Sequence, residues 1–233
     1  MKNTKKSLRR ITATLVTMAA SASFASAPIS GAGITFSMPS FSASAADTDV
    51  LTYKDFSYKV TENGIVITAY NGSETNPVIP SVIDETAVTA IGGSAFYNCT
   101  ALTEIEIPSS VTNIGCDAFY YCSNLEKLTL NEGLKTIGAN SFQGTKISSV
   151  NIPSTLTAVN MPSYDDHGPF YKSTTLKEVT IDDNAAIIPG YLFEKCSALE
   201  TIDIPYAVHT IGISAFENCT SLVSITIPQG VTR

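Results

Sequence analysis

Cysteine is the residue type whose spacing first suggests chemistry in this sequence. Four of the five cysteines share one position, three residues after a phenylalanine, and these are Cys99, Cys122, Cys196 and Cys219. They could be buried thiols that pack as small apolar side chains, disulfides between stacked copies, or zinc ligands. Stacked parallel side chains do not provide the torsion that a disulfide needs, and the sequence contains no C-x-x-C pair. We therefore favour buried thiols and keep disulfides and zinc as alternatives.

Histidine, the usual general base, occurs only as His167 and His209. A serine or cysteine hydrolase needs a nucleophile, a histidine base and an orienting group in one cleft. His209 occupies a position that holds Thr89 and Thr112 in other copies of the repeat described below, which indicates an ordinary exposed site. We predict no catalytic residue and expect that this chain is not an enzyme.

A six-residue insertion in the segment 160–174 interrupts the repeat described below. It contains Asp165, Asp166 and His167. This trio could bind a divalent cation, the loop could contact a partner, or it could be a solvated turn. The sequence alone does not separate these alternatives. We predict no metal site and no cofactor.

The elements that position these residues come from an internal repeat. An apolar anchor precedes a phenylalanine in every copy, five residues before it except in a wider fourth copy. The anchor pairs are Ile91/Phe96, Ile114/Phe119, Ile137/Phe142, Val159/Phe170, Ile188/Phe193 and Ile211/Phe216. The copies are about 23 residues long, and a unit of this size cannot bury its apolar face alone. The units must therefore stack into a solenoid.

Each unit is predicted to hold one short parallel strand, because period-two alternation of apolar residues recurs at 105–107, 128–130, 150–152, 179–181, 202–204 and 225–227. Proline, which lacks an amide donor, follows most of these strands and marks their ends. A glycine after most anchors, such as Gly115 or Gly138, is expected to permit a tight corner. The A-F-x-x-C segment should then pack Ala and Phe inward, in a short helical or irregular segment on the opposite side.

A different pattern precedes the repeats. Phe56 and Tyr58 alternate with polar residues, residues 62–64 read Glu-Asn-Gly, and Ile65 and Ile67 alternate back. This pattern predicts a β-hairpin that covers the first turn of the solenoid. We divide the chain into a signal peptide (1–46), an N-terminal β-hairpin cap (47–80) and a solenoid of about six repeats (81–233). The repeat pattern is cut in mid-unit at Arg233, so we expect a piece of a longer protein.

Residues 1–46 have the features of an export signal. They contain no acidic residue. Five basic residues lie within positions 2–10, and the stretch from residue 11 to residue 46 is uncharged and rich in small residues. Residues 43–45 read Ala-Ser-Ala, so cleavage is expected near Ala45 and Ala46. Residues 25–27 are a second candidate, which Pro28 disfavours. An uncleaved membrane anchor is the alternative, but Ser, Thr, Pro and Gly make a stable spanning helix a poor fit.

The remaining residues, 47–233, hold nine Lys and Arg against 21 Asp and Glu, a charge of −12. A polyanion would be repelled by this part of the chain, so nucleic acid is not an expected partner. No other segment is apolar enough to span a membrane.

The run of I-P-x-x-V-x-x-I-G-x-x-A-F-x-x-C-x-x-L units behind a signal segment and a hairpin resembles the BspA-type leucine-rich repeat proteins, over roughly residues 53–233. Asn131 and Asp182 replace the proline and Pro189 replaces the glycine in single copies. The resemblance implies a leucine-rich-repeat solenoid in a secreted or surface-displayed bacterial protein. Adhesion or host-protein binding is the activity that it attaches to some relatives, and it implies no catalytic chemistry.

The strands should present their polar residues on one outer surface, which we call the strand face. Its members are Glu104, Glu106, Lys127, Thr129, Ser149, Asn151, Glu178, Thr180, Thr201, Asp203, Ser224 and Thr226. Solenoids commonly bind ligands on such faces. This one lacks the Tyr, Trp or Arg anchors of a tight interface, which favours weak or multivalent contacts or a purely structural face.

Two functions remain open at this stage. The first is an exported, non-enzymatic protein that binds a protein or glycan ligand at the cell surface through its repeats, with affinity built by avidity. The alternative is a structural or accessory module of a longer secreted protein, whose active domain lies beyond residue 233 and could be an enzyme.

Overall fold

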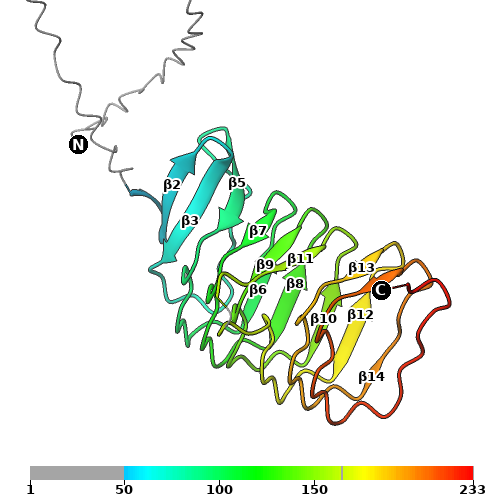
Figure 1. The fold of residues 1–233 in the computed structure, drawn as a ribbon. Coiled ribbons are helices and arrows are strands. Elements are labelled where there is room, and N and C mark those ends of the chain that lie inside the picture. Colours follow the sequence, from blue (N-terminus) through cyan, green and yellow to red (C-terminus); the bar gives the residue numbers. More distant parts are fainter. Residues whose placement is uncertain (1–49, 164, 233) are drawn as a thin grey trace, which may run out of the picture. The chain divides into compact units, whose positions relative to one another are not determined.

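The computed structural model describes residues 50–163 and 165–232. The predicted signal peptide and its cleavage site near Ala45 and Ala46 lie outside these residues. The described chain winds into a β-solenoid of about six turns (Figure 1), and no helix occurs within it. The predicted fold class is confirmed, and the segments opposite the strands are irregular.

The predicted N-terminal hairpin is present. Strands β1 (Leu51–Tyr53), β2 (Phe56–Thr61) and β3 (Gly64–Tyr70) pair antiparallel in that order. β3 then pairs parallel with β5 (Thr86–Ile91), and the short β4 (Val82–Ile83) pairs antiparallel with β5. The hairpin therefore joins the solenoid by continuing one of its ladders.

The strands of the strand face are β6 (Glu104–Ile107), β8 (Lys127–Leu130), β10 (Ser149–Ile152), β12 (Glu178–Ile181) and β14 (Thr201–Ile202). They pair parallel in two groups, β6 with β8, and β10 with β12 and β14. No ladder joins β8 to β10 in the described structure. The copy between Phe142 and Ile147 is one residue shorter than its neighbours, and β10 keeps the same alternation of exposed and buried residues as β8.

The strand predicted at 225–227 is wrong, because no ladder forms there among the described residues. Ile225 is half-buried and Ile227 is 48% exposed. The sequence alternates at residues 225–227, but the segment pairs with no neighbouring strand in the described structure.

Most turns contain two strands, whereas the sequence predicted a single strand in each turn. β5 continues through β7 (Asn113–Ile114), β9 (Thr136–Gly138) and β11 (Ala158–Asn160), and β13 (Ile187–Ile188) pairs with β15 (Thr210–Ile211). These strands coincide with the Ile-Gly corners. The six-residue insertion follows β11, which explains why the second ladder is interrupted between β11 and β13.

The corner glycines allow neighbouring turns to approach closely, because a side chain at these positions would meet the main chain of the preceding turn. Gly115 and Gly138 are not among the residues with positive φ. A Cβ placed on Gly138 would meet main-chain atoms of Gly115 and Cys116 in the preceding turn. The absence of a side chain, and not an unusual φ, is what this position requires.

The segments around each phenylalanine, which we call the Phe arcs, do contain left-handed residues. In most arcs these lie two residues before and two after the Phe, as with Asp117 (φ 57°) and Tyr121 (φ 56°) around Phe119. Such residues interrupt any helix. Alternate N–H groups instead donate to the next turn, as Phe119 N does to Ser141 O at 2.8 Å. The Phe arcs are therefore held by hydrogen bonds between turns.

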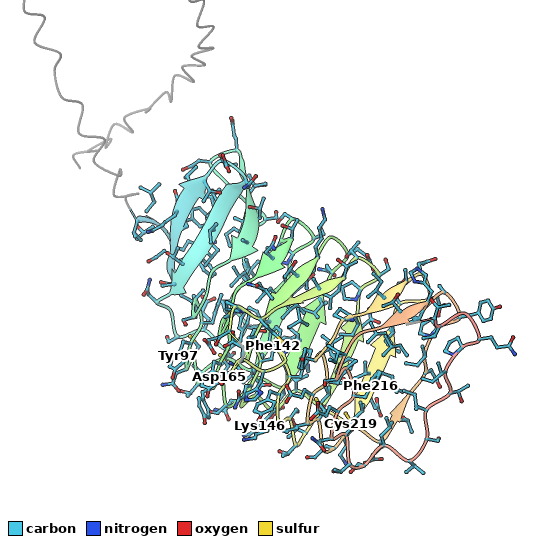
Figure 2. All side chains as sticks on the ribbon, viewed as in Figure 1. Tyr97, Phe142, Lys146, Asp165, Phe216 and Cys219 are labelled. Atoms are coloured by element: carbon cyan, nitrogen blue, oxygen red, sulfur yellow. The ribbon has the colours of Figure 1, made fainter. Side chains whose placement is uncertain are left out.

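The phenylalanines form a continuous spine inside the coil, where Phe142 and Phe216 are labelled in Figure 2. Ring centroids of Phe96 and Phe119 are 4.7 Å apart, and those of Phe119 and Phe142 are 5.2 Å apart. Phe170 continues the stack 5.2 Å from Phe142, although it belongs to the copy with the insertion. The wide fourth anchor pair of the sequence is thus a genuine repeat unit.

Candidate binding surface

All twelve residues of the strand face are exposed, while the residues between them are buried in the first five turns and Ile225 is half-buried in the last. β6 shows the pattern clearly, with Glu104 and Glu106 exposed and Ile105 and Ile107 buried. Thr201 lies in β14 and Asp203 just beyond it. Ser224 and Thr226 are exposed but lie outside any strand. The structure therefore brings the first eight predicted residues and Thr201 into ladders, and leaves the last three outside them.

The charge of the strand face is negative, with four carboxylates and one ammonium group. Lys127 Nζ lies 3.7 Å from Glu104 Oε2, and both side chains are about half exposed or more. Such exposed pairs contribute little to stability. Asn131 Nδ2 donates to Glu106 Oε1 at 2.8 Å. The carboxylates are concentrated on β6, at the end of the face nearest the hairpin.

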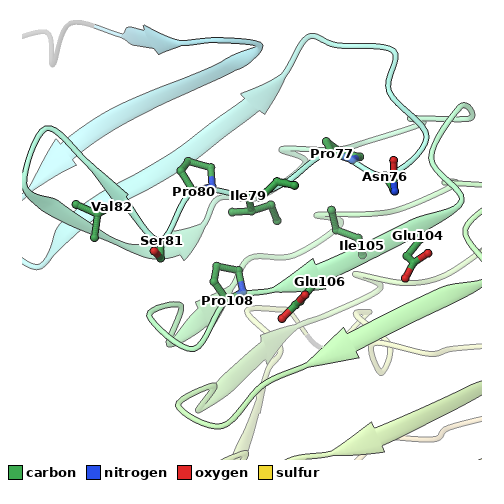
Figure 3. Close-up of a pocket in the computed structure, with 11 residues that line it drawn as sticks. Asn76, Pro77, Ile79, Pro80, Ser81, Val82, Glu104, Ile105, Glu106 and Pro108 are labelled. Atoms are coloured by element: carbon green, nitrogen blue, oxygen red, sulfur yellow. The ribbon is translucent and has the colours of Figure 1, made fainter.

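A groove of about 530 Å³ lies at this end of the strand face, between β6 and the segment 76–82 (Figure 3). Glu104 and Glu106 line one side, and Val78, Pro80 and Val82 line the other. Val78 is 83% exposed and Val82 is 52% exposed. The groove therefore combines an acidic side with an apolar side.

The repeat cysteines are structural in three of four cases. Cys122, Cys196 and Cys219 are buried free thiols, and each S–H donates to the carbonyl oxygen of the Phe in the preceding turn. Cys122 Sγ, for example, lies 3.0 Å from Phe96 O. The predicted burial is confirmed for these three. Cys99 is only half-buried, because the hairpin, and not another Phe arc, precedes its turn.

Cys99 is expected to be the most reactive thiol of the native chain. When Cys99 ionises, it accepts a hydrogen bond from Cys122, so the pKa of Cys99 is lowered and that of Cys122 is raised. Burial raises the pKa of Cys116, which is also half-buried. Since the thiolate is the nucleophile, iodoacetamide at pH 8 should alkylate Cys99 first, Cys116 more slowly and Cys196 only after unfolding. Peptide mapping by mass spectrometry reads this order, and equal native labelling of Cys99 and Cys196 would contradict it.

The insertion is anchored by a polar cluster that the sequence did not reveal. Glu194 is buried and accepts from the main-chain N–H of Gly168 at 3.3 Å. Its Oε1 lies 3.5 Å from His167 Nδ1 and 3.7 Å from Lys195 Nζ. The His167 ring stacks on Tyr171 with centroids 3.6 Å apart. His167 therefore fastens the loop to the next turn.

Asp166 lines a cavity of about 600 Å³ together with His167 and Glu194, but no contact of either insertion acid with His167 is seen in the described part. Asp166 Oδ2 accepts from Ser163 N at 2.7 Å, and Asp165 is exposed. Among residues 50–163 and 165–232, no group of three or more His, Cys, Asp or Glu side chains could hold a metal ion. The second histidine, His209, is exposed, and in the described part its side chain makes a hydrogen bond only with the Thr210 hydroxyl, at 3.2 Å.

Sequence reasoning missed an exposed tyrosine cluster on the Phe arcs. Tyr97 and Tyr121 are 53% and 49% exposed. The Tyr97 and Tyr120 rings stack at 5.5 Å, and Tyr120 packs edge-on against Tyr121 at 4.5 Å. The signal was present, because Tyr97 and Tyr120 each follow the repeat phenylalanine. Aromatic side chains absent from the strand face are thus gathered on the opposite side of the turns.

The described residues contain no helix long and apolar enough to cross a membrane.

Comparisons with known proteins agree with this architecture. The family described as "BspA type Leucine rich repeat region" matches residues 63–168 and 166–233, in six copies. A crystal structure of a leucine-rich repeat protein of T. pallidum is 28% identical with a TM-score of 0.63, and the match covers 78% of this chain and 84% of that one. No curated protein matches significantly.

Two further solved structures are longer than the matched region. A leucine-rich cell surface protein of Faecalibacterium prausnitzii is 25% identical with a TM-score of 0.50, covering 78% of this chain and 55% of that chain. The pneumococcal vaccine antigen PcpA is 20% identical with a TM-score of 0.55, covering 78% of this chain and 51% of that chain. The chain therefore spans about half the length of these two proteins.

Proposed function

This chain belongs to the BspA-type leucine-rich repeat family, and from that premise we propose that it is an exported, non-enzymatic protein that binds protein or glycan ligands at the cell surface. The observation that carries the proposal is the strand face, where each turn adds exposed polar side chains to one surface while the alternate residues stay buried. Repetition of weak contacts along such a surface gives avidity without a deep pocket.

The chemistry-bearing residues support binding over catalysis. Three repeat cysteines donate their S–H groups to buried main-chain carbonyls. His167 is held by Glu194 and Tyr171. These side chains are engaged in structural contacts, which leaves the acids of the strand face as the groups best placed to meet a partner.

Export and surface display are supported by the basic and small-residue pattern of residues 1–46. The relative from F. prausnitzii, at 25% identity, is described as a cell surface protein. Protease treatment of intact cells tests this part of the proposal, since a displayed solenoid is accessible to the protease and an internal one is protected.

Reversal of charge on the strand face should change ligand binding. We expect the double variant Glu104→Lys with Asp203→Lys to shift affinity several-fold and to alter its salt dependence, because both carboxylates are exposed on the face. The measurement is binding of the labelled chain to an array of extracellular matrix proteins and glycans at two ionic strengths.

The matched control reverses two exposed acids away from the strand face, Glu62→Lys with Glu217→Lys. It makes the same change in net charge. If both double variants bind alike, the net charge and not the strand face governs binding, and the face loses its proposed role.

A further inference from the structure

The segment 75–80 occupies the place of a strand in the first turn without pairing as one. Pro77 and Ile79 are buried and Val78 is exposed, the same alternation as Ile105, Glu106 and Ile107 in β6. Thr75 O accepts from Thr103 N at 2.7 Å and from Glu104 N at 3.2 Å. The pairing with β6 therefore starts correctly at Thr75.

The pairing then stops, and proline explains why. In a regular parallel ladder the next donor from this segment would be the N–H of residue 77, but proline has none. No further main-chain hydrogen bond joins described residues 76–80 to β6. β6 pairs with β8 along its other edge. Since Glu104 N points toward this segment and alternate residues share a side, the main-chain groups of Glu106 face the groove.

Figure 3 shows the residues that line the groove beside this open edge. Its volume is about 530 Å³. A second cavity, of about 350 Å³, is lined by Leu128 of β8 and by residues of β10 and β12, among them the neutral Ser149 and Asn151 together with Glu178. The groove at β6 is both larger and more acidic.

The lining residues define the kind of segment that fits. Outward positions beside Glu104 and Glu106 favour basic side chains, since both carboxylates are exposed and Lys127 pairs with only one of them. Alternate positions would lie on the side of Ile105 and Ile79, whereas the exposed Val78 adds an apolar contact on the outward side. An added strand with alternating basic and β-branched residues would place its basic side chains beside the two carboxylates and its β-branched side chains on the apolar side of the groove.

We propose that the open edge of β6 binds an extended segment of a partner protein as an added strand, with basic side chains beside Glu104 and Glu106. This inference rests on the proposed binding function and specifies how a ligand would bind, as a strand added to β6. Unpaired strand edges accept peptides in this way through main-chain hydrogen bonds, with side-chain pockets supplying specificity.

The test uses the full chain and a fluorescent peptide of alternating Lys and Val, six residues long, measured by fluorescence anisotropy. Two further versions carry N-methyl groups at alternate residues. In the first version the methylated nitrogens lie on one edge of the extended peptide, and in the second version they lie on the opposite edge. One methylated version should lose binding at least about fivefold, because it cannot donate to β6, while the other should bind as well as the parent. A block peptide, three Lys followed by three Val, should bind more weakly than the alternating one.

Protein variants locate the site. Glu106→Lys should weaken binding of the alternating peptide about fivefold or more. Glu178→Lys, which reverses an exposed outward carboxylate of β12 away from the groove, should change it less than about twofold. Glu106→Pro removes the edge donor and leaves the donors of Ile105 and Ile107 to β8, and circular dichroism checks that it folds. The peptide series remains decisive if that variant does not fold.

Absence of binding by the alternating peptide, or equal binding by both methylated versions, overturns the proposal. Equal weakening by Glu106→Lys and Glu178→Lys would also overturn it, because the peptide would then be sensing net charge. If the peptide fails while the labelled chain still binds the array through its strand face, the added-strand mode falls and the proposed binding function stands.

Discussion

Replacement of Phe119 by alanine is expected to lower the free energy of unfolding by about 3–5 kcal/mol, the usual cost of removing a fully buried aromatic ring. Phe119 is 0% exposed and stacks between Phe96 at 4.7 Å and Phe142 at 5.2 Å. Because each turn is stabilised mainly by its neighbours, the cavity would weaken two interfaces at once. Urea unfolding followed by circular dichroism gives the change, since the chain has no Trp for fluorescence.

Tyr97→Ala is the matched control for Phe119→Ala. Tyr97 lies one residue after the repeat phenylalanine of the preceding turn and is 53% exposed, so its truncation should cost less than about 1 kcal/mol. An unfolding midpoint for Phe119→Ala equal to that of the wild type would refute the assignment of this residue to the spine.

Replacement of Gly138 by alanine is expected to destabilise the chain by about 3 kcal/mol, at the upper end of typical overpacking costs. The backbone of Gly138 lies in β9 and does not have positive φ, so alanine is compatible with its conformation. The penalty comes from contact, because the new Cβ would lie against main-chain atoms of Gly115 and Cys116. Main-chain atoms cannot rotate away as a flexible side chain can.

Gly230→Ala separates this effect from a general cost of replacing glycine. A Cβ at Gly230 would meet only Val208 O, at 3.9 Å, an ordinary van der Waals distance. Thermal unfolding of the two variants should therefore differ clearly, with Gly230→Ala close to wild type. A Gly138→Ala variant as stable as Gly230→Ala would show that the turns separate at little cost.

The added-strand proposal follows from a defect in the repeat. Pro77 ends the pairing of the first turn with β6, and the ladders of the strand face form two groups, with no ladder between β8 and β10 in the described structure. The insertion adds a loop that Glu194 and His167 hold in place. Each departure exposes groups that a regular turn would cover, and the departure at β6 exposes main-chain donors and acceptors next to two carboxylates.

Much of the fold could be predicted from the chain alone. The spacing of Phe96, Phe119 and Phe142 indicated stacked equivalent turns, and the alternation at residues 104–107 indicated which side chains of β6 are buried. Both predictions are confirmed. Periodicity is sufficient for such predictions because equivalent positions in a solenoid have equivalent surroundings.

Contacts between turns required the tertiary structure. The clash that excludes a side chain at Gly138, the carbonyl that accepts from Cys122 and the pairing of His167 with Glu194 all join residues at least 22 positions apart. The second ladder and the open edge of β6 depend on the same stacking. The repeat pattern determined which residues are equivalent, whereas the local shift between stacked turns decided which main-chain groups pair and which remain open to a partner.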